Sequence, residues 1–353
     1  MWLDQLFEMF DNRIRLNPER LDRVASAYAN LTAFIKDDPP LADVYIALFQ
    51  QGSVAIDTAI KPPKEGDEFD VDAVFLLNIA KRPGDKQTPH EVISWIAERL
   101  RKNRHYEGKV HERARCVRIV YAGDFHVDVV PARLVGMRNN CIEVPSKTEG
   151  WRRTNPKGYV DWALMTNDVT QGQFVRVVRL IKYWRDVRFG NESKPKSIIL
   201  TTLLGQHVPR TSTSTAEALV VAMEGLSASL ESALFVPTIP NPSLPEENLA
   251  RDWIPSAFDL FRERFGAATQ RARKAYDLAR SDRDRSTREW IALFGESFPR
   301  LTGRDGKNLN TAVSKAVASV APSGKVLFRD DEKRGVEIRP HRFYGTENPQ
   351  TRN

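Results

Sequence analysis

Residues 69–77 read Phe-Asp-Val-Asp-Ala-Val-Phe-Leu-Leu, and a Gln-Gly-Ser turn precedes them at residues 51–53. Residues two apart in a strand point to the same face, so Asp70 and Asp72 project together from an otherwise apolar segment. A third carboxylate, Asp128, lies in a later apolar run that ends in Val-Val-Pro. Like charges beside a core are unfavourable unless a cation holds them, so the pattern predicts a metal site.

The metal that suits three converging carboxylates is Mg²⁺, which prefers oxygen ligands and shares them with phosphates. Backbone N–H groups and a hydroxyl at Gly52 and Ser53 can approach a phosphate. Together these residues indicate two-metal phosphoryl or nucleotidyl transfer. Asp124 is an alternative third ligand, but its Gly-Asp context is better explained by a turn. His126 shares the alternation of Asp128 and can touch the site, although a core or surface histidine is the more ordinary interpretation.

The composition is that of a globular protein with real cores: 353 residues, 41% hydrophobic and 28% charged. The net charge is +7 and the pI is about 9.3. This charge suits a polyanionic ligand such as nucleotides or nucleic acid, and it suits an ordinary solvated basic surface equally well.

Two cysteines, Cys116 and Cys141, are too few for a disulfide framework, and no Cys/His cluster has zinc-ligand spacing. Acidic residues near the start disfavour a signal peptide, and no apolar run reaches membrane-spanning length. We therefore expect a cytoplasmic protein with no membrane partner and with buried, reduced thiols.

Strand patterns flanked by helical patterns, with mostly antiparallel neighbours, predict an α+β nucleotide-binding region over residues 1–150. Residues 151–300 read as mainly helical, and residues 301–353 form a polar, basic extension of unknown role. The clearest boundary signals are Asn17-Pro18 before one helix and the capping box that Thr88 and Glu91 form at the start of another. The expected helices after residue 150 span residues 158–166, 172–187, 197–206, 215–233, 256–280 and 287–294.

Two residues of the helical region are candidates for phosphate contact. Lys182 lies one helical turn from Arg179, so both can face one cleft, although lysines usually lie on a solvated face. Ser197 follows two lysines and is expected to cap the next helix, a geometry that also suits phosphate binding. Basic residues between 99 and 118 suit nucleic acid or, more simply, a solvated loop, whereas residues 262–288 mix both charges as an exposed, salt-bridged helix does.

The order Gly52-Ser53, Asp70, Asp72 and Asp128 resembles the nucleotidyltransferase core of the DNA polymerase β superfamily. More narrowly, the chain is similar to the bacterial cGAS/DncV-like nucleotidyltransferases (CD-NTases). The segments that narrow the resemblance are residues 180–184 (Leu-Ile-Lys-Tyr-Trp), 196–197 (Lys-Ser), 241–242 (Asn-Pro), 247–251 (Glu-Asn-Leu-Ala-Arg) and 290–298 (Trp-Ile-Ala-Leu-Phe-Gly-Glu-Ser-Phe). The resemblance covers roughly residues 1–300 and implies a two-lobed fold with a nucleotide cleft between the lobes.

The resemblance also implies roles. Asp70 and Asp72 would bind two Mg²⁺ ions, for which Mn²⁺ can substitute, and Asp128 would complete the site and help deprotonate the attacking ribose hydroxyl. Gly52 and Ser53 would hold the triphosphate of the donor nucleotide, with Lys182 and Ser197 contacting it from the helical lobe. Family members make cyclic di- or trinucleotides from nucleoside triphosphates, ATP among them, and release pyrophosphate. The product activates an effector in anti-phage defence, and regulatory proteins are possible partners.

Two features depart from the family pattern. The resemblance has a second glycine in many relatives where this chain has Asp57, and the Asp57 carboxylate either weakens donor binding or points outward. Residues 301–353 also extend past the usual end of the family. The zinc-binding insert of the animal DNA sensor is absent, so nucleic acid is not required as an activator. The alternatives left open are an RNA-tailing nucleotidyltransferase, a non-catalytic nucleotide- or RNA-binding scaffold, and a small nucleotidyltransferase that modifies protein or tRNA.

Overall fold

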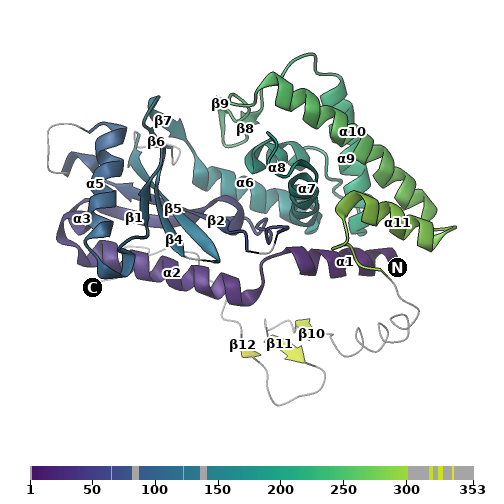
Figure 1. Ribbon diagram of the computed structural model, residues 1–353, viewed down its shortest axis with the longest axis horizontal. Helices are drawn as coiled ribbons and strands as arrows, with labels where there is room; N and C mark the ends of the chain where they lie inside the picture. Colours follow the sequence, from purple (N-terminus) through teal and green to yellow (C-terminus); the bar gives the residue numbers. More distant parts are fainter. Residues whose placement is uncertain are drawn as a thin grey trace, which may run out of the picture. The chain divides into compact units, whose positions relative to one another are not determined.

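The structure is a computed structural model that describes residues 2–64, 66–81, 87–121, 123–135, 141–300, 318–320, 325–328 and 336–337. It divides into two compact units, Met1–Pro299 and Arg300–Asn353. The larger unit contains a mixed sheet covered by helices and a second, mainly helical part (Figure 1). The predicted α+β class is therefore confirmed.

The sheet of the larger unit has seven strands in the described part of the chain. The central order is β1-β2-β5-β4-β3, and β6 and β7 extend it from β5. β2 and β5 pair in parallel, whereas the other strand pairs in the described part of this sheet are antiparallel. The sheet continues through β7, beyond residue 150. The strands are β1 Tyr45–Gln51, β2 Phe69–Leu77, β3 Val110–Glu112, β4 Val117–Tyr121, β5 Phe125–Leu134, β6 Ile142–Ser146 and β7 Gly150–Thr154.

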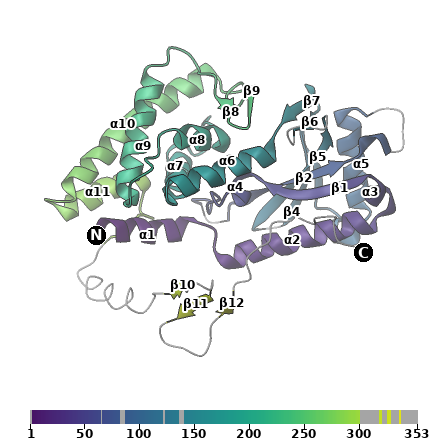
Figure 2. The ribbon, with the colours of Figure 1, turned by 180° about the vertical axis from the view of Figure 1, so that it is seen from behind.

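Helices α2 (Pro18–Asp37), α3 (Pro39–Val44) and α5 (Pro89–Arg101) share one apolar core with the sheet, and Figures 1 and 2 show α2 running along it. The start signals of two of them are confirmed. The Asn17 side chain accepts the N–H of Arg20, and Thr88 forms a complete capping box with Glu91. These caps satisfy backbone donors that would otherwise be unpaired at the helix N-termini.

The second part of the larger unit consists of helices around α7, which is buried along most of its length. Aromatic rings fill this core: Trp184 of α7 meets Phe265 of α10 with ring centroids 5.5 Å apart. All six helices predicted after residue 150 are present, with shifted ends. They are α6 Pro156–Val169, α7 Gln173–Phe189, α8 Ser197–Gly205, α9 Thr215–Glu231, α10 Pro255–Leu278 and α11 Arg283–Phe294, joined in part by the short pair β8 Pro240–Asn241 and β9 Leu244–Asn248.

The N-terminal helix α1 (Trp2–Ile14) packs against this helical part, although the sequence analysis groups it with residues 1–150. The Phe7 ring lies 4.9 Å from the Trp290 ring of α11, centroid to centroid, in an edge-to-face contact. The Trp2 indole N–H donates to the carbonyl of Ala279 at 3.3 Å. Figure 2 shows α1 beside α9 and α11, so the two ends of the larger unit meet in one core.

A buried ion pair connects α1, α7 and the loop that follows the Gly-Ser motif. The Arg179 guanidinium donates to both carboxylate oxygens of Asp11, at 2.7 and 2.6 Å. It also donates to the backbone carbonyl of Asp57 at 2.6 Å and to its carboxylate at 3.2 Å. Asp57 has a φ of 53°, a left-handed value that glycine adopts at less cost than other residues. The Asp57 side chain is 82% exposed and pairs with Arg179.

The smaller unit contains an antiparallel sheet in the order β10-β11-β12. Its strands are β10 Ala318–Val320, β11 Lys325–Phe328 and β12 Val336–Glu337, while the rest of the predicted extension 301–353 lies outside the described residues. Among the described residues, no helix has both the length and the apolar composition needed to cross a bilayer.

Replacing Arg179 by Met is expected to lower the free energy of unfolding by about 3 to 5 kcal/mol, because Asp11 would be left charged and buried. Urea unfolding measures this loss. The matched control is Arg271→Met, which breaks an exposed pair with Glu289 and should cost less than about 1 kcal/mol. Equal losses in the two variants would contradict a structural role for the buried pair.

Candidate active site

The parallel pairing of β2 with β5 brings the sequence-predicted carboxylates together. Asp72 lies directly opposite Asp128 in the register, and Asp70 lies opposite His126. Because each of these positions is two residues from the next on its strand, all four side chains belong to one face of the sheet. The sequence predicted the alternation within each strand, and the tertiary pairing places the two strands side by side.

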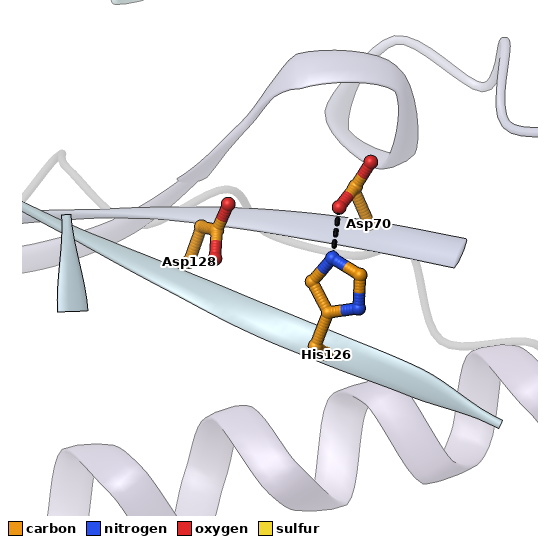
Figure 3. A group of neighbouring side chains, drawn as sticks. All are labelled: Asp70, His126 and Asp128. Atoms are coloured by element: carbon orange, nitrogen blue, oxygen red, sulfur yellow. Dashed lines mark ion pairs between the residues drawn. The ribbon is translucent and has the colours of Figure 1, made fainter. Parts of the chain in front are cut away.

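Asp70, His126 and Asp128 each offer one ligand atom, and these three atoms lie within 4.8 Å of one another. Figure 3 shows them projecting from the two neighbouring strands, with Asp70 paired to the imidazole of His126. Carboxylate oxygens suit hard divalent cations such as Mg²⁺ and Mn²⁺, and imidazole is a common ligand of softer divalent metals. The donor set therefore fits a divalent metal.

Asp72 lies beneath the predicted phosphate turn. Burial, together with the charges of Asp128 and Asp70, raises the pKa of the Asp72 carboxyl to about 7. Gly52, the first residue of the short helix α4 (Gly52–Ala55), has a φ of 69°, and a Cβ there would collide with the Asp72 carboxylate. Glycine is thus required at position 52 both by backbone conformation and by the close approach of Asp72.

Two basic side chains of the protein contact the carboxylates. The Arg118 guanidinium makes a two-point contact with Asp128, at 2.7 and 2.8 Å, and reaches Asp70 at 3.3 Å. His126 contacts Asp70 through Nε2, and its Nδ1 lies 3.3 Å from a carboxylate oxygen of Glu68. The hydrogen bond from His126 lowers the pKa of Asp70, and the same bond raises the pKa of His126.

Lys182 and Ser197, the two predicted contacts from the helical part, line the same cleft as Ser53 and Asp70. The Lys182 amino group is buried and donates to the carbonyl of Thr58 at 2.7 Å, so it holds the loop after the Gly-Ser motif. Burial and the neighbouring Arg185 lower the pKa of Lys182 to about 7. The volume of the cleft is about 980 Å³.

The expected helix cap at Ser197 is wrong. Lys196 occupies the N-cap position of α8, no side chain caps this helix, and Ser197 is its first helical residue. The Ser197 hydroxyl instead accepts a hydrogen bond from Arg185 at 3.1 Å. The two lysines before position 197 gave a misleading start signal, because the extended residue before the helix is Lys196 itself.

The sequence favours other roles for two residues of the site, His126 and Arg118. The signal for His126 was its position two residues before Asp128, and the signal for Arg118 was the hairpin register that sets it opposite Asp128. Asp124, the alternative third ligand, lies elsewhere: its carboxylate pairs with Arg20 and Arg23 of α2 at 3.2 and 3.1 Å.

Four of the eight lysines and arginines between residues 99 and 118 pair with acids, Arg118 among them. Arg99 contacts Asp38, Arg101 contacts Glu112 and Arg115 contacts Glu149. The mixed-charge stretch 262–288 also forms ion pairs as predicted, including Lys274 with Glu289 at 2.6 Å. Paired arginines have less charge to offer a polymer backbone than free ones.

Residues 1–167 match the model of the second messenger oligonucleotide or dinucleotide synthetase domain. The c-di-GMP synthase of Roseivirga ehrenbergii is 32% identical over 68% of this chain and 70% of its own length. The chain belongs to the bacterial CD-NTase family of nucleotidyltransferases. The cyclic AMP-AMP-AMP synthase of an Acinetobacter species is a more distant CD-NTase relative, 25% identical over 85% of this chain and 86% of its own length.

A solved structure of the CD-NTase CdnG from Bradyrhizobium diazoefficiens, in complex with GTP, has a similar fold. Its TM-score is 0.69 at 19% sequence identity, and the match covers 88% of this chain and all of the CdnG chain. The likeness spans both the sheet and the helical part, which supports the predicted nucleotidyltransferase fold.

Replacing Gly52 by Ala is expected to abolish divalent-metal binding at the carboxylates, because the added methyl group displaces Asp72. Gly108→Ala is the matched control, since Gly108 has a φ of 72° and nothing within 4 Å of an added Cβ. Both variants should lose about 1 to 2 kcal/mol of unfolding free energy from backbone strain. Only Gly52→Ala should lose Mn²⁺ binding in an electron paramagnetic resonance titration, and intact binding would refute the role of the close contact.

Proposed function

We propose that this CD-NTase makes a cyclic di- or trinucleotide second messenger from nucleoside triphosphates, ATP among them, and releases one pyrophosphate for each bond formed. The observation that carries the proposal is Asp72 opposite Asp128 on parallel strands, with Asp70 on the same face. The synthase names of the relatives support this class of product. The base choice, ring size and linkage depend on contacts within the cleft.

In this proposal Asp70, Asp72 and Asp128 hold two Mg²⁺ ions, for which Mn²⁺ can substitute. When bound, the ions would lower the pKa of the acceptor ribose hydroxyl and stabilise the charge of the leaving pyrophosphate. Asp128 accepts the proton of the acceptor hydroxyl as its oxygen attacks the α-phosphorus. The bond from that phosphorus to the bridging oxygen of the pyrophosphate then breaks.

The donor triphosphate lies over Gly52 and Ser53 in this proposal, and Ser197 contacts it from the helical part. The triphosphate would favour the charged form of Lys182, which lies beneath it in this proposal and fixes the loop through the carbonyl of Thr58. A first transfer joins two nucleotides, and a later transfer within the linear product closes the ring. Fixed groups of this kind accelerate the reaction through positioning and charge stabilisation.

We further propose that the enzyme acts in the cytoplasm during anti-phage signalling. Its product would activate a downstream effector, and regulatory proteins would control its activity. Nucleic acid is not required in this scheme, because the arginines of the basic run are mostly paired with acids.

The direct test is incubation of the purified protein with all four radiolabelled nucleoside triphosphates and Mg²⁺ or Mn²⁺. We expect a phosphatase-resistant product, which mass spectrometry identifies by its bases and ring size. Elongation of an added RNA primer without any cyclic product would instead establish the RNA-tailing alternative. Binding of nucleotide or RNA with no transfer would favour the scaffold.

Asp70→Asn and Asp72→Asn are each expected to reduce synthesis by at least a hundredfold, because each removes a carboxylate that neutralises the metals. Asp259→Asn, on the exposed surface of α10, is the control and should keep full activity. Product formation at the wild-type rate in either site variant would refute the assignment.

Asp72→Asn is also expected to stabilise the metal-free protein above neutral pH, by on the order of 2 kcal/mol. The folded-state pKa of Asp72 is raised from 3.8 to about 7, so its ionisation destabilises the fold progressively from about pH 4 to pH 7. The advantage of the variant should therefore vanish near pH 4 and be complete above pH 7. Urea unfolding in EDTA across this range measures it, and a pH-independent difference would contradict the charge repulsion.

A further inference from the structure

Arg118 lies where a bound metal would compete with it for the carboxylates. Its Nε and Nη2 atoms contact the two oxygens of Asp128, and Nη2 also reaches an oxygen of Asp70. Both acids are proposed metal ligands. Arg118 therefore occupies the place between two carboxylates that would bind the ions. The position is set by the hairpin register, which places Arg118 opposite Asp128.

The contacts of Asp70 strengthen this arrangement. The Asp70 oxygen that Arg118 reaches is also the one that His126 Nε2 contacts. The Nδ1 atom of His126 lies 3.3 Å from Glu68, which also accepts the backbone N–H of Gly123. One carboxylate oxygen of Asp70 is thus engaged by two side chains, while its side chain as a whole is 64% exposed and able to turn toward an ion.

The charges decide what Arg118 does. A guanidinium stays protonated at any physiological pH, so it always opposes a second cation within a few ångströms. A bare divalent ion must displace Arg118 from Asp70 and accept its repulsion beside Asp128. A nucleoside triphosphate brings several negative charges of its own, which offset that repulsion.

We propose that Arg118 is a counter-cation that makes divalent-metal binding at Asp70 and Asp128 depend on the nucleotide. Without nucleotide, Arg118 offsets the repulsion among the carboxylates and keeps metal affinity low. With nucleotide, the triphosphate charges allow the ions to bind, and Arg118 retains Asp128 through its two-point contact. The proposal rests on the proposed nucleotidyl-transfer site, and it concerns how the metal ions bind there rather than which product forms. Arg118 acts here as a positioning residue.

The test is Mn²⁺ binding measured by electron paramagnetic resonance, with and without a non-hydrolysable ATP or GTP analogue. In the wild type the analogue should tighten Mn²⁺ binding. Arg118→Gln should bind Mn²⁺ roughly tenfold more tightly than the wild type in the absence of nucleotide, with a smaller gain on adding the analogue. Arg118→Lys keeps the charge and should stay within about twofold of the wild type.

Arg101→Gln is the matched control, because it removes the same charge from an exposed pair with Glu112 and should leave Mn²⁺ binding unchanged. Arg118→Met fills similar space without charge and repeats the test if Arg118→Gln does not fold. Unchanged or weaker Mn²⁺ binding in the uncharged variants without nucleotide would overturn the proposal. If the protein shows the expected nucleotide-dependent Mn²⁺ binding but makes no cyclic product, the role of Arg118 is supported. In that case only the proposed reaction is overturned.

Discussion

The parallel pairing of β2 with β5 sets Asp72 opposite Asp128, and the rest of the site depends on this juxtaposition of like charges. A sheet interior offers too little solvent to screen them, so their repulsion raises the free energy of the folded protein. The apolar core that α2 and α5 share with the strands stabilises the fold and offsets this unfavourable free energy. A site that weakens the fold when empty is one that gains most from a cation.

The protein distributes compensating groups around the carboxylates rather than neutralising them completely. Arg118 holds Asp128, His126 holds Asp70, and Gly52 provides space for Asp72. Burial, together with the charges of Asp128 and Asp70, nevertheless keeps the pKa of the Asp72 carboxyl raised. A divalent ion would neutralise the charge of these carboxylates and would then attract a triphosphate.

The helical part contributes to the site mainly through two long cationic side chains of α7. Arg179 and Lys182 bind the carbonyls of Asp57 and Thr58, so the loop after the Gly-Ser motif is held by a helix from the other side of the cleft. Asp11 completes this connection by bringing α1 into the same ion pair. The geometry of this loop and the packing of the two parts are therefore coupled.

The sequence by itself determined the strand alternation of Asp70 and Asp72, the glycine of the Gly-Ser turn, the capping box of Thr88 and the apolar periodicity of six helices. Each of these depends on residues close together along the chain, whose geometry local backbone preferences set. Only the tertiary structure decided that Asp70 meets His126, that Arg118 joins two carboxylates and that Asp57 pairs with Arg179. These contacts join residues far apart in the chain or depend on which strands become neighbours. They form only when the folded chain buries those residues and brings their charges together.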